Sequence, residues 1–126
     1  MSRVLIVEDN EKNLKLLRDL LQLKGYETVE ARTGEEAVRM AQHTSPDLVL
    51  MDIQLPDIDG IEALRRIRAD PAIAATAVVA VSASVMPEHR ARIMTSGFNA
   101  YLTKPINVRE FLALVARHFA GGGFRE

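Results

Sequence analysis

Four short apolar runs in this sequence each lead into residues that can do chemistry. Glu8 and Asp9 follow the first run, Asp52 the second, Ser82 the third and, one residue further on, Lys104 the fourth. If these ends meet, three carboxylates, a hydroxyl and an ammonium share one site. Carboxylates held close together repel one another and have raised pKa values unless a cation joins them. Mg²⁺ suits such a set, because it binds carboxylate, water and phosphate oxygens together.

These groups make up half of a phosphoryl-transfer site, with a metal, a carboxylate nucleophile, a positive clamp and a hydroxyl donor. The sequence has no glycine-rich phosphate loop, since Gly34 and Gly60 stand alone. The phosphoryl group is therefore expected to arrive on a partner molecule rather than on a bound nucleotide. Each residue alone is typical of a loop, a helix cap or a solvated surface, but their recurrence after successive strands favours a joint site.

Alternating strand and helix patterns would position these residues. The apolar runs predict strands at residues 4–7, 48–51, 77–81 and 100–102, and residues 26–30 predict a weaker, edge-like strand. Helical spacing follows each run, with Asn10 and Thr33 as expected caps and a last helix over 108–119 that carries Val108 and Phe111 on one face. This alternation predicts an α/β fold, a doubly wound five-stranded parallel sheet whose site lies beyond the carboxyl ends of its central strands.

Composition narrows the class of protein. The chain has 126 residues, no Cys, and 16 basic against 17 acidic residues, so it has neither thiol chemistry nor a field that would attract nucleic acid or an anionic membrane. No apolar stretch approaches the roughly 20 residues that span a bilayer. We therefore expect a cytoplasmic protein without membrane insertion, with one domain over 1–120 and a glycine-rich tail over 121–126.

Three segments carry a family resemblance: VLIVEDN at 4–10, LMDIQLP at 50–56 and YLTKP at 101–105. They resemble the receiver domain of response regulators in two-component signalling, and most closely the single-domain DivK type. The resemblance implies a flavodoxin-like fold with strand order 2-1-3-4-5. It also implies a signalling domain whose only chemistry is its own phosphorylation and dephosphorylation.

The resemblance implies a role for each site residue. Asp52 corresponds to the phosphoacceptor, while Ser82 and Lys104 correspond to the groups that contact the phosphoryl oxygens. The implied Mg²⁺ ligands are Glu8, Asp9, Asp52 and the backbone carbonyl of Gln54. The implied switch residues are Ser82, Tyr101 and Pro105. Asp57 and Asp59 are expected to form the turn before Gly60 rather than to bind metal.

The first helix carries a second apolar stripe beside its core-facing one, which suggests a partner surface. By the resemblance, the residues expected to dock a partner are Asn10, Asn13, Leu16, Leu20, Pro105 and Ile106. The expected partners are a sensor histidine kinase or a histidine phosphotransferase, and a downstream protein target. The protein itself is expected to be a monomer or a weak dimer.

Three other readings of the sequence stay open at this point. The chain could be a receiver domain excised from a hybrid histidine kinase or a larger regulator. It could be a phosphohydrolase with an aspartyl-phosphate intermediate, although such enzymes usually carry the nucleophile after the first strand. It could also be a flavodoxin-like cofactor binder, although a carboxylate-lined pocket repels a phosphate group in the absence of a metal.

Overall fold

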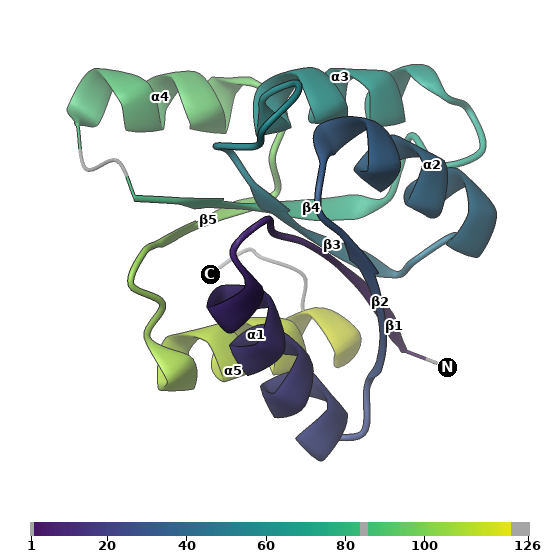
Figure 1. The fold of residues 1–126 in the computed structure, drawn as a ribbon, viewed down its shortest axis with the longest axis vertical. Helices are drawn as coiled ribbons and strands as arrows, with labels where there is room; N and C mark the ends of the chain where they lie inside the picture. Colours follow the sequence, from purple (N-terminus) through teal and green to yellow (C-terminus); the bar gives the residue numbers. More distant parts are fainter. Residues whose placement is uncertain (1, 84–85, 122–126) are drawn as a thin grey trace.

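A parallel five-stranded sheet runs through the centre of the protein (Figure 1). The computed structural model describes residues 2–83 and 86–121. The strands are β1 (Arg3–Val7), β2 (Glu27–Ala31), β3 (Leu48–Asp52), β4 (Ala77–Ser82) and β5 (Ala100–Thr103). Their order in the sheet is β2-β1-β3-β4-β5, so the predicted flavodoxin-like α/β fold and its strand order are confirmed.

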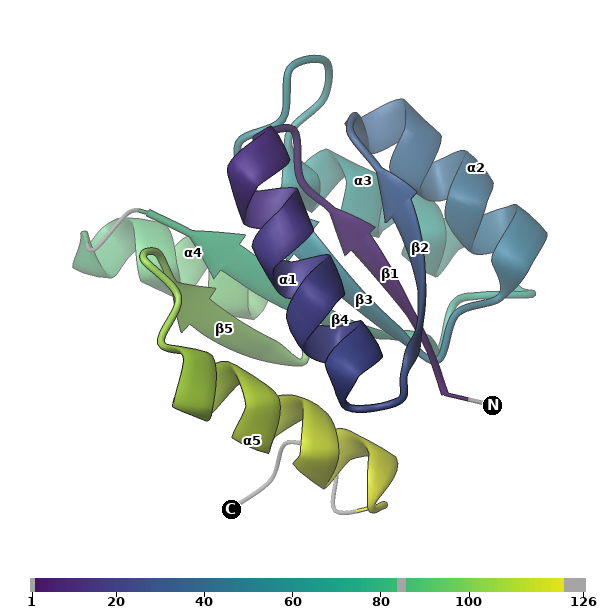
Figure 2. The same cartoon turned by 60° about the horizontal axis from the view of Figure 1, so that its bottom comes forward.

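Helices cover both faces of this sheet (Figures 1 and 2). The helices are α1 (Glu11–Leu23), α2 (Gly34–Thr44), α3 (Gly60–Ala69), α4 (Pro87–Thr95) and α5 (Val108–Phe119). Helices α1 and α5 pack on one face, and α2, α3 and α4 pack on the other. The crossovers between parallel strands require helices on both faces, and this accounts for the two layers.

Strand β1 shows how the core divides between the two faces. Leu5 and Val7 lie in the apolar cluster on the α2–α3–α4 side, whereas Val4 and Ile6 lie in the cluster on the α1–α5 side. All four are at most 1% exposed. Because successive side chains of a strand point to opposite faces, a strand that is covered on both sides must be apolar at every position.

Side-chain caps fix where the helices begin. Asn10 accepts a hydrogen bond from the backbone N–H of Asn13, and Thr33 accepts one from Glu36, as predicted. Asp59 caps α3 in the same manner. Each cap satisfies an N–H group that has no partner inside its helix, so the polar residue just after a strand or loop also starts the next helix.

The strand register aligns the carboxyl ends along one edge of the sheet. Val7 pairs with Met51 in the next strand, and Ser82 pairs with Thr103. At this edge Gly60, the first residue of α3, packs directly on the end of β3. A Cβ at position 60 would lie 2.5 Å from the carbonyl oxygen of Asp52 and 2.9 Å from the Cα of Ile53. Only glycine permits this approach of α3 to the strand that carries Asp52.

The last helix departs from the predicted pattern at its first residue. Phe111 and Val115 are fully buried, but Val108 is 39% exposed although its spacing places it on the same face. Helical side chains lean toward the preceding turn, and Val108 has no preceding turn to lean on. The predicted tail over 121–126 lies outside the described residues beyond Gly121.

We predict that Gly60→Ala lowers the free energy of unfolding by about 2 kcal/mol, because the new methyl group meets backbone atoms that cannot rotate away. Gly25→Ala is the matched control. Its φ of +89° is unfavourable for alanine, but nothing lies within 4 Å of the added Cβ, so a cost of only about 1 kcal/mol is expected. Urea unfolding measures both values. A Gly60→Ala variant as stable as Gly25→Ala would contradict the packing argument.

Candidate functional site

The polar residues that follow four strands lie together at one edge of the sheet. Glu8 and Asp9 follow β1, Asp52 and Ser82 are the last residues of β3 and β4, and Lys104 follows β5. Glu8, Asp52 and Ser82 are buried, at 2%, 4% and 3% exposure, while Asp9 is exposed. The structure thus brings together all five residues that the sequence singled out.

One ammonium group joins the two buried carboxylates. The Nζ atom of Lys104 lies 2.9 Å from Oε1 of Glu8 and 2.9 Å from Oδ2 of Asp52. Backbone donors take part of the remaining acceptor capacity, because the N–H of Asn10 donates to Glu8 and that of Gln54 donates to Asp52. Every fully buried polar side-chain atom in the described part of the chain has a hydrogen-bond partner.

Burial and crowding change the protonation of this cluster. Burial raises the pKa of Glu8 above its usual range, and the neighbouring Asp52 carboxylate raises it further. Partial burial of Lys104 opposes its charged form, but its hydrogen bonds to Asp52 and Glu8 prevail and raise its pKa. The raised pKa of Glu8 is the effect that the close spacing of the acids predicts.

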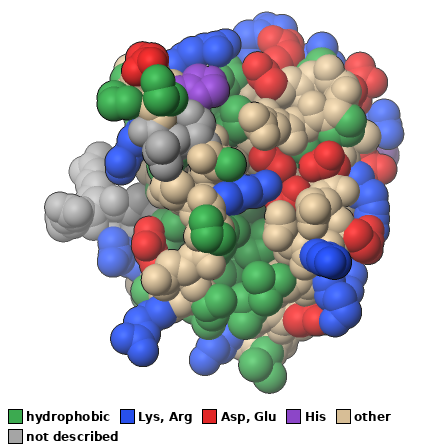
Figure 3. All heavy atoms as spheres, turned by 60° about the vertical axis from the view of Figure 1, so that its left-hand side comes forward, with side chains coloured by type: hydrophobic (Ala, Val, Ile, Leu, Met, Phe, Trp, Pro, Cys, Tyr) green, Lys and Arg blue, Asp and Glu red, His purple; other side chains and the backbone are tan. Residues whose placement is uncertain are grey.

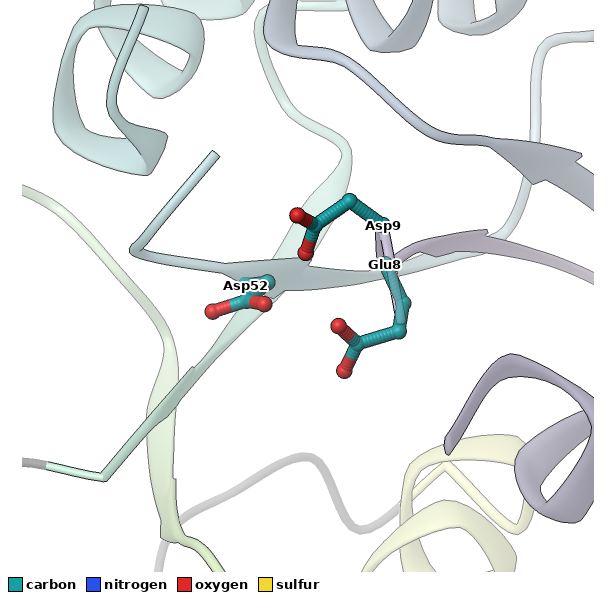
Figure 4. A group of neighbouring side chains, drawn as sticks. All are labelled: Glu8, Asp9 and Asp52. Atoms are coloured by element: carbon teal, nitrogen blue, oxygen red, sulfur yellow. The ribbon is translucent and has the colours of Figure 1, made fainter. Parts of the chain in front are cut away.

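The carboxylates of Glu8, Asp9 and Asp52 point toward one small space, as Figure 4 shows. One oxygen from each of Glu8, Asp9 and Asp52 lies within 4.8 Å of the others, a spacing that allows all three to ligate one metal ion. A set made only of carboxylate oxygens suits a hard cation such as Mg²⁺ rather than a soft transition metal.

The two remaining polar positions of the site are Ser82, at the end of β4, and Gln54, which follows β3. The backbone N–H of Lys104 donates to the carbonyl of Ser82 across 2.9 Å, so the residue after β5 is held beside the end of β4. Gln54 follows Asp52 by two residues and has an exposed side chain. Ser82 and Gln54 therefore lie at the same edge of the sheet as the carboxylates.

The predicted switch residues lie on the β5 side of the site. Tyr101 is half-buried against the α2–α3–α4 layer, and the Arg90 guanidinium from α4 lies 5.2 Å from the centre of its ring. This cation–π contact links α4 to β5. The bond between Lys104 and Pro105 is cis, and Pro105 is exposed.

A groove of about 390 Å³ opens beside Lys104, between α1 and the segment after β5. Its lining includes Asn13, Leu16, Pro105 and Ile106, so four of the predicted docking residues lie together. Leu20 lines a neighbouring groove along α1 with Leu16, which is 44% exposed, and Leu23, which is 81% exposed. Figure 3 shows this side of the molecule, where hydrophobic side chains gather beside acidic ones.

The structure adds detail to two predicted assignments. Asn10 caps α1 and lines neither of these two grooves, and its place among the docking residues stays a prediction. Asp57, expected only to form a turn, accepts hydrogen bonds from the backbone N–H groups of Gly34 and Glu35, 23 and 22 residues earlier. Neither segment carries a local signal for this contact, because the contact joins two parts of the chain that are distant in sequence. Sequence reasoning also missed Leu17 and Ala83 in the first groove.

Within the described residues, no helix has the length and apolar character needed to cross a membrane.

Comparison with known proteins adds independent information. Residues 4–116 match the family model of the response regulator receiver domain. The polar-differentiation response regulator DivK of Brucella ovis is 45% identical over 112 residues, which cover 89% of this chain and 91% of the relative. The DivK protein of Brucella anthropi matches equally well, with the same identity and coverage.

Solved structures show the same likeness in three dimensions. Chemotaxis protein CheY4 of Vibrio cholerae superposes with a TM-score of 0.86 at 27% identity, over 93% of this chain and 98% of that one. The receiver domain of sensor histidine kinase PA1611 from Pseudomonas aeruginosa gives 0.87 at 32% identity, over 94% and 98%. That structure has a magnesium ion coordinated in its active-site cleft.

We predict that Lys104→Met destabilises the protein by about 3 kcal/mol at neutral pH without added metal, because two buried carboxylates lose the cation between them. The control is Lys15→Met, which removes an exposed pair with Asp19 on α1 and is expected to unfold near the wild-type urea concentration. Urea unfolding in EDTA measures the difference. Equal unfolding midpoints for the two variants would show that Lys104 does not hold the cluster.

Proposed function

Since the chain belongs to the response regulator receiver domain family, the phosphoryl-accepting module of two-component signalling, we propose that Asp52 is its phosphoacceptor. The observation that supports this assignment is the position of Asp52. It ends the central strand β3, it is buried, and Lys104 and Glu8 flank its carboxylate. Receiver domains are signalling domains, and the family match does not favour the phosphohydrolase and the cofactor-binder readings of the sequence.

The donor set at this edge fits Mg²⁺. Glu8, Asp9 and Asp52 offer three carboxylate oxygens within 4.8 Å of one another, and the backbone carbonyl of Gln54 is the further ligand that the resemblance suggests. We assign these four residues as the Mg²⁺ site of this chain. When bound, Mg²⁺ would supply positive charge that reduces the repulsion between the acidic site and an incoming phosphoryl group.

The residues of the chain then perform the transfer. An oxygen of the Asp52 carboxylate attacks the phosphorus of a phosphohistidine presented by a sensor histidine kinase or a histidine phosphotransferase. A phosphorus–oxygen bond forms as the phosphorus–nitrogen bond breaks, and the electron pair of that bond stays on the imidazole. Lys104 neutralises charge on the transferred group, and the Ser82 hydroxyl donates a hydrogen bond to it. The product is an acyl phosphate, which water hydrolyses.

The grooves beside α1 support the choice of partner. The first groove is lined by Asn13, Leu16, Pro105 and Ile106 and opens next to Lys104. A protein that covers these apolar residues would bring its own reactive side chain to the edge where Asp52 lies. We propose this surface, continued by Leu20, as the docking face for the phosphodonor.

The modification of Asp52 provides the first test of this function. After incubation with Mg²⁺ and acetyl phosphate, the wild type is expected to gain the mass of one phosphoryl group, and Asp52→Asn is expected to gain none. Asp59→Asn is the matched control, since it changes an acid in the same loop while Asn caps α3 as well as Asp does. Intact mass spectrometry measures all three proteins. Covalent label on Asp52→Asn would refute the assignment.

The metal site provides a second test. Asp9→Asn removes an exposed carboxylate that has no ion pair among the described residues, so its effect on folding should be small. We expect it to weaken Mg²⁺ binding at least tenfold, because changes even outside the ligand shell weaken metal sites by that factor. Calorimetric titration with MgCl₂ measures the affinity, with Asp59→Asn again as control. Unchanged affinity in Asp9→Asn would exclude Asp9 as a ligand.

A further inference from the structure

We propose that Asp57 is a positioning residue for the Mg²⁺ site: it holds the loop between β3 and α3, and with it Gln54, against the start of α2. This role rests on the proposed function, because it concerns the same metal site. Asp57 itself is not offered as a ligand. The inference is carried by its hydrogen bonds to α2 and by the packing of its neighbour Ile58.

The first observation is the pair of hydrogen bonds that Asp57 accepts. Its Oδ1 accepts from the N–H of Gly34 at 2.7 Å, and its Oδ2 accepts from the N–H of Glu35 at 2.9 Å. Burial disfavours the charged form, but these backbone donors prevail and lower the pKa of the Asp57 carboxyl. The carboxylate thus remains ionised and bonded at neutral pH.

These bonds complete the N-terminus of α2 from a distant segment. The first N–H groups of a helix have no partner within it. At α2, Thr33 supplies the acceptor for Glu36, as an ordinary cap does, whereas Asp57 supplies both acceptors for Gly34 and Glu35. Figure 2 shows the loop between β3 and α3 rising near the start of α2. A rigid helix end therefore anchors the middle of this loop.

The second observation is the packing of Ile58 on Gly34. A Cβ at position 34 would lie 2.3 Å from Cγ1 of Ile58 and 3.0 Å from its backbone oxygen. Gly34 is buried, and Ile58 packs against the apolar cluster beneath α2 and α3. A larger residue at position 34 must displace the side chain of Ile58 and press on its backbone oxygen, and so it disturbs the loop.

Between its ends, the loop has its two hydrogen bonds to α2 and the packing of Leu55 and Ile58 against the apolar cluster. At one end the N–H of Gln54 donates to Asp52, and at the other end Asp59 caps α3 and the N–H of Gly60 donates to Ile53. Gln54 lies only three residues before Asp57. Loss of the hydrogen bonds to α2 is therefore expected to loosen the segment that carries the proposed carbonyl ligand, while Asp52 stays in its strand.

The test compares Mg²⁺ affinity in four proteins by calorimetric titration: wild type, Asp57→Ala, Gly34→Ala and Thr33→Ala. We expect the dissociation constant to rise about tenfold in Asp57→Ala, and to rise in Gly34→Ala, which moves the same loop by a steric route. Thr33→Ala is the matched control. It removes a cap from the same helix end but leaves the loop contact, so its dissociation constant should stay within twofold of wild type.

A second readout separates positioning from general destabilisation. Amide hydrogen exchange at Gly34 and Glu35 should accelerate in Asp57→Ala, and the Mg²⁺ concentration for half-maximal phosphorylation by acetyl phosphate should rise in parallel with the dissociation constant. Asp57→Asn should fall between wild type and Asp57→Ala, since its amide offers one acceptor where the carboxylate offers two.

The outcomes are distinguishable. If the wild type binds Mg²⁺ and folded Asp57→Ala binds it within twofold, the positioning role is wrong while the proposed function stands. If Thr33→Ala weakens binding as much as Asp57→Ala does, a loosened helix end explains the loss, and the role is again wrong. If the wild type binds no Mg²⁺, the proposed metal site fails and the role falls with it.

Discussion

The site depends on one electrostatic compromise, in which a single lysine ammonium is shared by two buried carboxylates. Glu8 and Asp52 are almost completely buried, and Lys104 lies 2.9 Å from both. Burying either carboxylate alone would cost free energy, and removing the cation would leave both buried carboxylates without a compensating charge. The compromise is incomplete, because the exposed Asp9 adds a third carboxylate beside the pair. Three carboxylates held beside a single ammonium inside a fixed frame would favour a bound cation at this edge.

The frame comes from the parallel sheet rather than from any local motif. Parallel strands point their carboxyl ends to the same edge, so residues that follow β1, β3, β4 and β5 meet without being near in sequence. The register brings Ser82 level with Thr103, and the N–H of Lys104 donates to the carbonyl of Ser82. Gly60 lets α3 approach the carbonyl of Asp52. The chemistry is thus placed by backbone pairing, which tolerates little movement.

The features that could be predicted from the sequence are those whose signal lies within one short stretch of the chain. Apolar runs that lead into polar residues identified the central strands, the sheet edge and the five polar residues, because burial on both faces leaves a clear pattern. Local caps such as Asn10 were predictable for the same reason, since their signal lies within a few residues. The contact of Asp57 with α2 could not be predicted, because the residues of neither segment indicate that the two segments meet. The exposure of Val108 was missed because helical spacing identifies a face but not whether an end is covered.

The same geometry limits how far phosphorylation alone can drive a change of shape. Under the proposed chemistry, Ser82 and Lys104 each gain a charge-assisted bond to the phosphoryl group, worth about 1.5–3 kcal/mol apiece, or about 3–6 kcal/mol together. Lys104 already holds two carboxylates in the resting protein, so its net gain lies toward the lower end of that range. Reversing a two-state population from 1:99 to 99:1 needs about 5.5 kcal/mol. Phosphorylation would therefore shift the conformational equilibrium on the β4–β5 side of the sheet, where Arg90 of α4 lies over Tyr101. A bound partner must supply the remaining free energy for a complete change.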